Sequence, residues 1–157
     1  MTLFNWFGKK SSALQVERDQ FLQALDNSGN SFMIANANRE IIYTNKAVIT
    51  MLRKSESAIR KELPKFSVDD LIGSNIDSFH KNPAHQRMML ERLSTTHIAD
   101  ISLGGLSFKL ILNPIVGANR EHLGTSVEWI DRTEAILAEI TTARTLEALD
   151  NTSTNVM

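Results

Sequence analysis

The most constraining feature of the sequence is a set of three stretches between residues 96 and 131 that have the composition of β-strands. The first two, THIADISL and LSFKLILN, meet at Gly104-Gly105, a dipeptide that favours the two-residue turn of a tight hairpin. A longer loop, VGANRE, leads from this hairpin into the third stretch, HLGTSVEWID. Connections this short predict three neighbouring antiparallel strands.

The first half of the chain predicts a second hairpin and helices that cover the sheet. SFMIANANREIIYTN looks like two strands, at 32–35 and 41–44, joined by a polar turn. Asn45 follows as the N-cap of a short helix that runs to Leu52. The charged stretch after this helix is expected to be a linker or a short helical piece, because Pro64 interrupts it.

The two ends of the chain are expected to be helical. A helix is predicted at 12–27, where apolar residues gather on one side, after a loosely ordered leader. A second helix is predicted at 133–149, with Asp131 and Glu134 as its capping pair. These helices flank the sheet-forming part of the chain.

The order of these elements predicts an α+β fold, a five-stranded antiparallel sheet with helices over one face. A chain of 157 residues, 42% of them hydrophobic, can bury one sizeable core. We expect a leader and helix at 1–29, the domain at 30–133, and a helix with a disordered tail at 134–157. A sheet covered in this way leaves a pocket between its inner face and the helices.

Charge and composition argue against several classes of protein. The net charge is −1, with 17 basic and 18 acidic residues, so no basic excess favours nucleic-acid binding. The absence of cysteine excludes disulfides, thiolate metal sites and covalent attachment of c-type haem. No run approaches the roughly 20 apolar residues of a membrane helix, and no signal peptide is recognisable, so we expect a cytoplasmic protein without a membrane span.

Alternation along the last two strands brings Leu110 and Trp129 onto one inward face. Strand side chains alternate between the two faces of a sheet, and the apolar side is the buried one. On the third strand Leu123, Thr125 and Val127 are expected to share the side of Trp129. Because the two strands are hairpin neighbours, Leu110 and Trp129 should lie opposite or diagonal, within roughly 8 Å. The buried indole N–H needs an acceptor, either a backbone carbonyl or a ligand.

Two histidines flank a helix start in the stretch FHKNPAHQ. Asn82 and Pro83 predict an N-cap side chain and the first helical position. His80 precedes the cap on irregular backbone, free to point across the pocket, whereas His85 lies in the first turn, where the helix dipole disfavours imidazolium. Both are expected to be mostly neutral near pH 7, the form that binds a metal. The alternative is that each satisfies a nearby backbone group.

The chain resembles a PAS domain over about Asn30 to Thr133. The segments IIYTNKAV, DLIGSNI and DRTE lie where PAS domains carry similar ones. More narrowly, FHKNPAHQ together with VEWIDRTE is similar to the PAS sensors of bacterial methyl-accepting chemotaxis proteins. Among these, the sequence looks like the soluble aerotaxis-type receptors, whose PAS domain binds b-type haem and senses oxygen.

The resemblance implies particular roles for the residues in these motifs. His80 matches the axial ligand of the haem iron, Trp129 the donor of a hydrogen bond to bound oxygen, and Leu110 a residue of the distal wall. His85 belongs to the same motif as His80, so we expect it to be a cofactor-binding residue as well. An indole N–H favours oxygen over carbon monoxide, because bound oxygen takes on negative charge and carbon monoxide stays neutral.

The resemblance also implies a route for the signal. In this family the helix after the D-x-T segment passes signals to HAMP or methyl-accepting modules, and Trp129 lies two residues before Asp131. No such module follows in this sequence, so we expect a fragment or a chain that acts through a partner. Ile136, Ile140 and Ala143 have the spacing of a short coiled coil, which favours a homodimer.

Three alternatives remain open from the sequence. The first is a PAS sensor for flavin or another small ligand, although a photoactive flavin domain is disfavoured because its adduct-forming cysteine is missing. The second is an interaction module without a cofactor. The third is an iron oxygenase, in which Asp77, His80 and His85 form a two-histidine, one-carboxylate site, but no motif spacing supports it. We therefore expect a sensor rather than an enzyme.

Overall fold

The computed structural model of the protein describes residues 3–80 and 82–154. Its strands are β1 (Ser31–Asn36), β2 (Ile41–Thr44), β3 (His97–Leu103), β4 (Leu106–Val116) and β5 (His122–Asp131). Its helices are α1 (Leu3–Asp26), α2 (Lys46–Ile59), the 3-10 helix η1 (Ile76–Phe79), α3 (Pro83–Glu91) and α4 (Thr133–Thr154).

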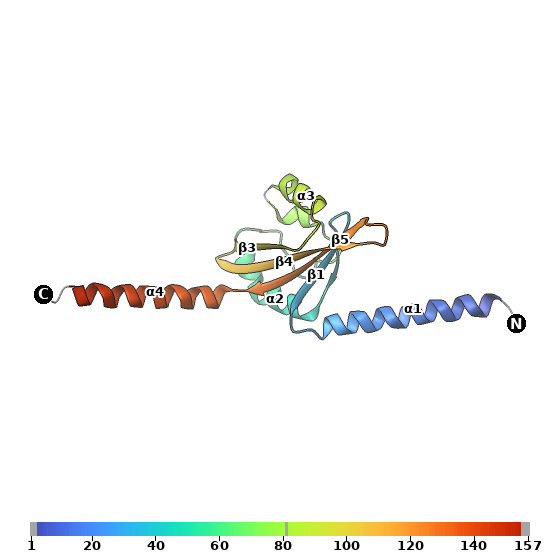
Figure 1. Cartoon of the computed structure of the whole chain (residues 1–157), viewed down its shortest axis with the longest axis horizontal. Coiled ribbons are helices and arrows are strands. Elements are labelled where there is room, and N and C mark those ends of the chain that lie inside the picture. The colour runs from blue at the N-terminus through green and yellow to red at the C-terminus, as the bar shows by residue number, and fades with distance from the viewer. Residues whose placement is uncertain (1–2, 81, 155–157) are drawn as a thin grey trace.

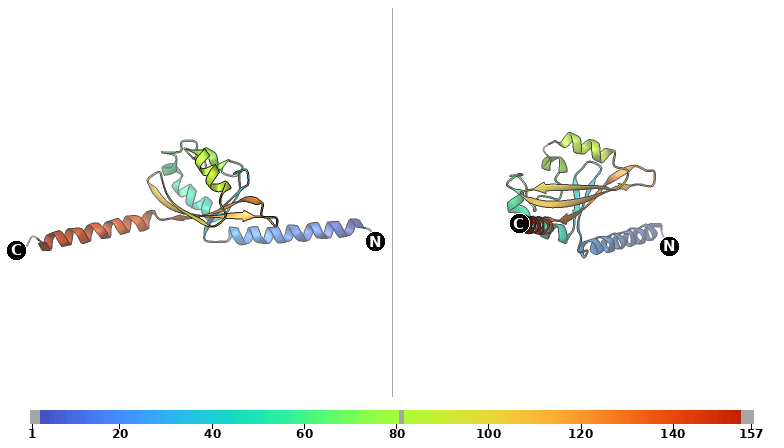
Figure 2. Two further views of the ribbon diagram at one scale, coloured as in Figure 1. Left: turned by 45° about the horizontal axis from the view of Figure 1, so that its top comes forward. Right: turned by 60° about the vertical axis from the view of Figure 1, so that its left-hand side comes forward.

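The five strands form one antiparallel sheet in the order β2-β1-β5-β4-β3. Helices α2 and α3 lie over the same face of this sheet, here called the inner face, as the left view of Figure 2 shows. Helices α1 and α4 leave the domain in opposite directions and do not cover the sheet (Figure 1). The predicted α+β fold, with a five-stranded antiparallel sheet and helices over one face, is confirmed.

The β3–β4 hairpin turns at Gly104-Gly105, as the sequence predicts, and the turn rests on the end of α2. Gly104 has a φ of +63°, and a Cβ at this position would collide with the carbonyl of Ala58. The backbone N–H of Gly104 donates a 2.7 Å hydrogen bond to the Glu62 carboxylate. Only glycine combines this backbone conformation with so close an approach. The hairpin is therefore fixed against the helical layer at its turn.

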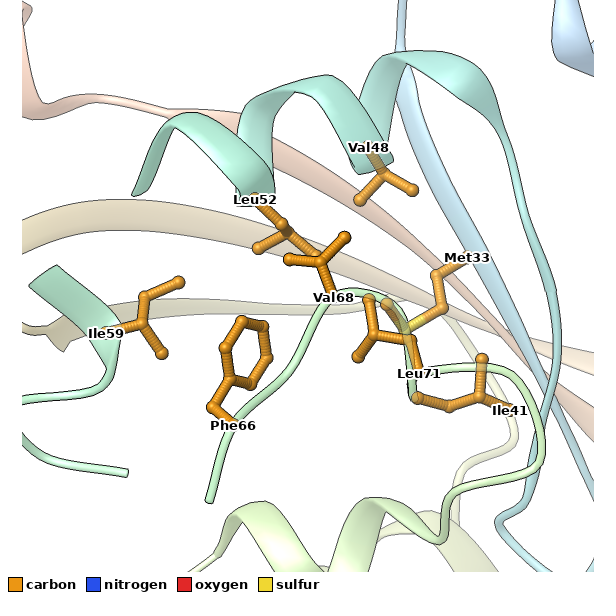
Figure 3. Close-up of a cluster of buried hydrophobic side chains, with 8 residues drawn as sticks. All are labelled: Met33, Ile41, Val48, Leu52, Ile59, Phe66, Val68 and Leu71. Carbon is orange, nitrogen blue, oxygen red and sulfur yellow. The ribbon is translucent and has the colours of Figure 1, made fainter. Parts of the chain in front are cut away.

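Helix α2 supplies the helical side of the hydrophobic core. Its buried residues, Val48, Leu52, Ser55 and Ile59, recur at the spacing of one helix face. They pack with residues from β1, β2 and the segment after α2, and Figure 3 shows the eight apolar members of this cluster. The prediction that this helix ends at Leu52 is wrong, because the charged residues that follow it lie on its solvent side while Ser55 and Ile59 continue the buried face.

The helix at the N-terminal end is longer than the sequence indicates. Helix α1 begins at Leu3, so the prediction of a loosely ordered leader is wrong from that residue onward, and residues 1 and 2 lie outside the described range. The predicted helix after Asp131 is confirmed as α4, but it runs to Thr154, so the prediction that a disordered tail follows residue 149 is wrong up to that residue. The Asp131 carboxylate accepts a 2.9 Å hydrogen bond from the backbone N–H of Thr133. No helix within the described residues is long and apolar enough to cross a membrane.

Asn45 joins four parts of the fold through its side chain. It is fully buried, and its Oδ1 accepts hydrogen bonds from the backbone N–H groups of Phe32, at 2.9 Å, and Val48, at 3.0 Å. Its Nδ2 donates to the carbonyls of Leu25, at 3.0 Å, and Asn30, at 2.7 Å. One amide therefore caps α2 and ties that helix to β1 and to the end of α1.

We predict that Asn45→Ala lowers the free energy of unfolding by about 3 kcal/mol or more, since each buried group left without a partner costs about 1–3 kcal/mol. Asn38→Ala is the matched control, because Asn38 is an exposed turn residue and its loss should stay within about 0.5 kcal/mol. Urea unfolding of the three proteins measures both effects. Equal midpoints for the parent and Asn45→Ala would contradict this role.

Candidate functional site

A cavity of about 580 Å³ lies between the inner face of the sheet and the helical layer. Leu110, Leu112 and Val127 line it from the sheet, and Phe79 and Leu90 are among the apolar residues that line it from the other side. The volume falls within the roughly 300–1,000 Å³ of sites for small organic ligands and cofactors. The pocket expected from the layer arrangement is therefore present, with mainly apolar walls.

Trp129 and Leu110 face this cavity from neighbouring strands. The β4–β5 register pairs them directly, which confirms the predicted alternation. The indole ring is held edge-on against the buried Phe108, with ring centroids 5.7 Å apart and an interplanar angle of 75°. Its Nε1 is buried and has no hydrogen-bond partner among the described residues. A buried donor without an acceptor costs about 1–3 kcal/mol. Trp129 therefore lines the cavity and carries a buried polar group that has no acceptor among the described residues.

His80 lines the same cavity from the helical side. It is the C-cap residue of η1, and its ring is exposed at the cavity opening rather than buried. Nδ1 lies 2.7 Å from the carbonyl oxygen of Ile76. Because a carbonyl only accepts, Nδ1 carries the proton of the neutral ring and Nε2 keeps its lone pair. A hydrogen bond of this kind fixes the tautomer and orientation of histidines that bind metals.

His85 and Gln86 lie in the first turns of α3 and also line the cavity. His85 is exposed, as His80 is. The prediction that the Asn82 side chain caps this helix is wrong, because Asn82 is the N-cap residue but forms no side-chain capping bond. The sequence reasoning passed over Gln86, whose Oε1 is buried without a partner among the described residues.

Asp77 links η1, which precedes His80, to α3, which follows it. Its Oδ2 accepts hydrogen bonds from Nε of Arg39, at 3.3 Å, and from Nε of Arg87, at 2.8 Å. Burial alone would raise the pKa of this carboxyl, but the guanidinium groups of Arg87 and Arg39 outweigh it and hold the pKa below its ordinary value. The carboxylate thus stabilises the fold near neutral pH, and this contribution is lost as the pH falls through the lowered pKa.

The suggested carboxylate site of Asp77, His80 and His85 is wrong. No group of three histidine, aspartate or glutamate side chains within the described residues is arranged to hold a metal ion. Asp77 is instead engaged by its two arginines.

A β-bulge changes the face of two residues near the start of β5. The register pairs Ile115 with Gly124 but Val116 with His122, so Leu123 is the extra residue. The prediction that Leu123 faces inward is wrong: it is 50% exposed, and His122 lines the cavity instead. A Cβ at Gly124 would collide with the Ala35 carbonyl of β1, which explains the glycine here. This glycine is the one signal in the sequence that could have indicated the bulge.

Comparison with known proteins identifies the family. No protein-family model matches the chain. A solved structure of the Aer2 receptor from Vibrio cholerae, described as a dual PAS-heme oxygen sensor, is 34% identical, with a TM-score of 0.57, and covers 65% of this chain and 93% of that chain. The chain belongs to the PAS domain family. The PAS domain of Bordetella pertussis BvgS, 18% identical with a TM-score of 0.52, covers 87% of this chain and 98% of its own and shares the fold.

A curated relative connects this PAS domain with bacterial chemotaxis. The methyl-accepting chemotaxis protein McpB of Pseudomonas aeruginosa is 46% identical over 125 residues, which is 80% of this chain. The match covers 18% of that receptor, so the chain corresponds to a small part of its length. The resemblance to PAS sensors of chemotaxis receptors is therefore confirmed at the level of fold and family.

Proposed function

We propose that this PAS domain is a b-type haem sensor that binds oxygen or another diatomic gas in chemotaxis signalling. The observation that carries the proposal is that a possible metal ligand and a hydrogen-bond donor line the same cavity. His80 presents a free Nε2 from the helical side, and Trp129 presents an unsatisfied N–H from the sheet. The 34% identical Aer2 structure, described as a PAS-heme oxygen sensor, supports the same interpretation.

The residues of the cavity fit a haem. Its walls are mainly apolar, as the porphyrin plane requires, and the opening beside His80 and His85 can leave the propionates in water. A ferrous haem with one strong protein ligand keeps an open position for a diatomic gas. His80 would hold the iron through Nε2, while its Nδ1–H bond to Ile76 keeps the ring in position.

Trp129 and Leu110 would form the wall that faces the gas. The contact with Phe108 holds the indole plane, and the indole N–H has no acceptor among the described residues. A hydrogen bond to an acceptor that carries charge is worth about 1.5–3 kcal/mol. Leu110, directly across the β4–β5 pair, keeps water from competing for that N–H.

The response would leave the domain through β5 and α4. Trp129 lies two residues before Asp131, which caps the start of α4. Arg132 donates a 2.8 Å backbone hydrogen bond to Ser107, and Thr133 Oγ1 accepts one of 3.0 Å from the same residue. A shift of the indole therefore acts on the segment that sets the direction of α4. A HAMP or methyl-accepting module in the longer receptor is the proposed recipient.

We predict that His80→Ala removes most of the Soret absorbance of the haem-loaded protein, because the iron loses its protein ligand. His97→Ala is the matched control, since His97 is an exposed residue of β3 that does not line the cavity. The measurement is an absorption spectrum of each protein after loading with haem and gel filtration. A His80→Ala variant that keeps the parent spectrum would contradict the assignment of His80 as the iron ligand. A parent protein that stays colourless after loading would contradict the proposed haem cofactor.

We predict that Trp129→Phe weakens oxygen binding by about ten- to a hundred-fold, which corresponds to the loss of about 1.5–3 kcal/mol. Phenylalanine keeps the apolar wall, so haem should remain bound. Carbon monoxide serves as the internal control, because a neutral ligand gains little from the indole N–H, and its affinity should change much less. Oxygen and carbon monoxide titrations of the two proteins measure this difference. Unchanged oxygen affinity would contradict the proposal that Trp129 donates a hydrogen bond to bound oxygen.

A further inference from the structure

One end of the mainly apolar cavity carries basic and polar side chains. Arg39, from the turn between β1 and β2, lines the cavity, as do His122 and Thr125 from the start of β5. The sheet brings these residues together, because Asn36 of β1 pairs with Gly124 of β5. The backbone N–H of Arg39 donates a 2.9 Å hydrogen bond to the Asn36 carbonyl. Neither Arg39 nor His122 has a role in the proposed binding of iron or gas.

Arg39 has a backbone conformation that is unfavourable for an arginine. Its φ is +66°, in the left-handed region, where turns of hairpins usually carry glycine or asparagine. Glycine would avoid this strain, because it has no Cβ. Strained backbone of this kind occurs mainly at functional sites, and the Arg39 side chain lines the cavity.

The Arg39 guanidinium is only partly engaged by the protein. Its Nε donates to Asp77 Oδ2 at 3.3 Å, and its two terminal nitrogens form no hydrogen bond within residues 3–80 and 82–154. The same carboxylate oxygen accepts a shorter bond, of 2.8 Å, from Nε of Arg87. Glu40, the acidic residue of the turn, accepts from Asn36 Nδ2 at 2.9 Å instead. One carboxylate thus faces two guanidinium groups, which leaves a positive charge beside the cavity.

His122 reaches the cavity because of the bulge at Leu123. Its Nε2 lies 3.4 Å from the hydroxyl oxygen of the buried Thr125. When the hydroxyl donates to Nε2, the proton of the neutral ring is on Nδ1. Nδ1 forms no hydrogen bond in the part of the chain that the structure describes. The ring therefore has a donor that is free to bind a ligand in the cavity.

The carboxylates that line the cavity lie elsewhere in its wall. Glu62 accepts from the Gly104 N–H at the β3–β4 turn, which lies near the C-terminal end of β5, whereas His122 begins that strand. Glu91 is exposed at the end of α3. An anionic group in the cavity is therefore favoured at the end with Arg39 and repelled at the end with Glu62.

We propose that this basic end of the cavity binds carboxylate, and that Arg39 and His122 hold the propionate groups of haem. The inference rests on the proposed haem function, since haem carries two carboxylates at one edge of a flat apolar ring. Hydrogen bonds between charged groups are about twice as strong as neutral ones. Asp77 joins Arg39 to η1, which ends at His80, so this end lies beside the opening. Both side chains are partly exposed, so the propionates also keep contact with water.

The test compares haem with haem dimethyl ester, in which both carboxylates are neutral esters. The apo form of the full chain is titrated with each ferric porphyrin, and binding is followed by the quenching of tryptophan fluorescence. Arg39→Met and His122→Leu should each weaken haem binding about ten-fold, and should change the affinity for the ester less than about two-fold. His122→Arg keeps a donor and should restore the affinity for haem. Circular dichroism confirms that each variant is folded.

Arg87→Met and His97→Leu are the matched controls, because neither residue lines the cavity, and Arg87→Met also removes one partner of Asp77. Each should change the affinity for the two porphyrins by the same factor. The proposal is overturned if Arg39→Met and His122→Leu bind haem as the parent does, or lose affinity for haem and ester equally. A control that loses affinity for haem alone also overturns it. A parent that binds neither porphyrin overturns the proposed function, and this inference with it.

Discussion

The indole N–H of Trp129 is the group on which the account of the site depends. It is buried in the wall of a mainly apolar cavity, without an acceptor among the described residues, and the edge-on contact with Phe108 keeps it there. A buried donor without an acceptor lowers the stability of the fold, and an apolar ring of similar size would avoid that cost. We propose that a ligand in the cavity accepts from the indole, and that His80, whose Nδ1 lies 2.7 Å from the Ile76 carbonyl oxygen, binds the iron of that ligand through Nε2.

Strand β5 connects the features that a sensor needs. Trp129 points into the cavity, Glu128 points to the opposite face, and Asp131 ends the strand at the start of α4. Pairing with β1 on one side and β4 on the other places this strand in the middle of the sheet. We propose that a displacement that begins at the cavity reaches the C-terminal helix through this strand.

Local sequence patterns predict much of this arrangement. The predictions that are wrong fail for physical reasons. The short VGANRE connection and the alternation of apolar residues predict that Leu110 and Trp129 lie opposite or diagonal on one face, and the structure pairs them directly. The inward position of His122 was not predictable in that way, because the bulge at Leu123 reverses the alternation. The charged residues after Leu52 predict a linker, but they lie on the solvent side of α2, which continues to Ile59. The contact of His80 with Ile76 depends on the fold of η1, which the sequence indicates only loosely.

We propose that this cavity holds a haem iron between His80 and a gas that the indole of Trp129 recognises. A crystal structure of the ferrous, haem-loaded chain in oxygen tests it most directly. The account predicts His80 Nε2 on the iron, Nδ1 still bonded to the Ile76 carbonyl, and Trp129 Nε1 about 3 Å from the gas. An iron held by another side chain, or an indole bonded to a backbone carbonyl of the protein, would contradict it.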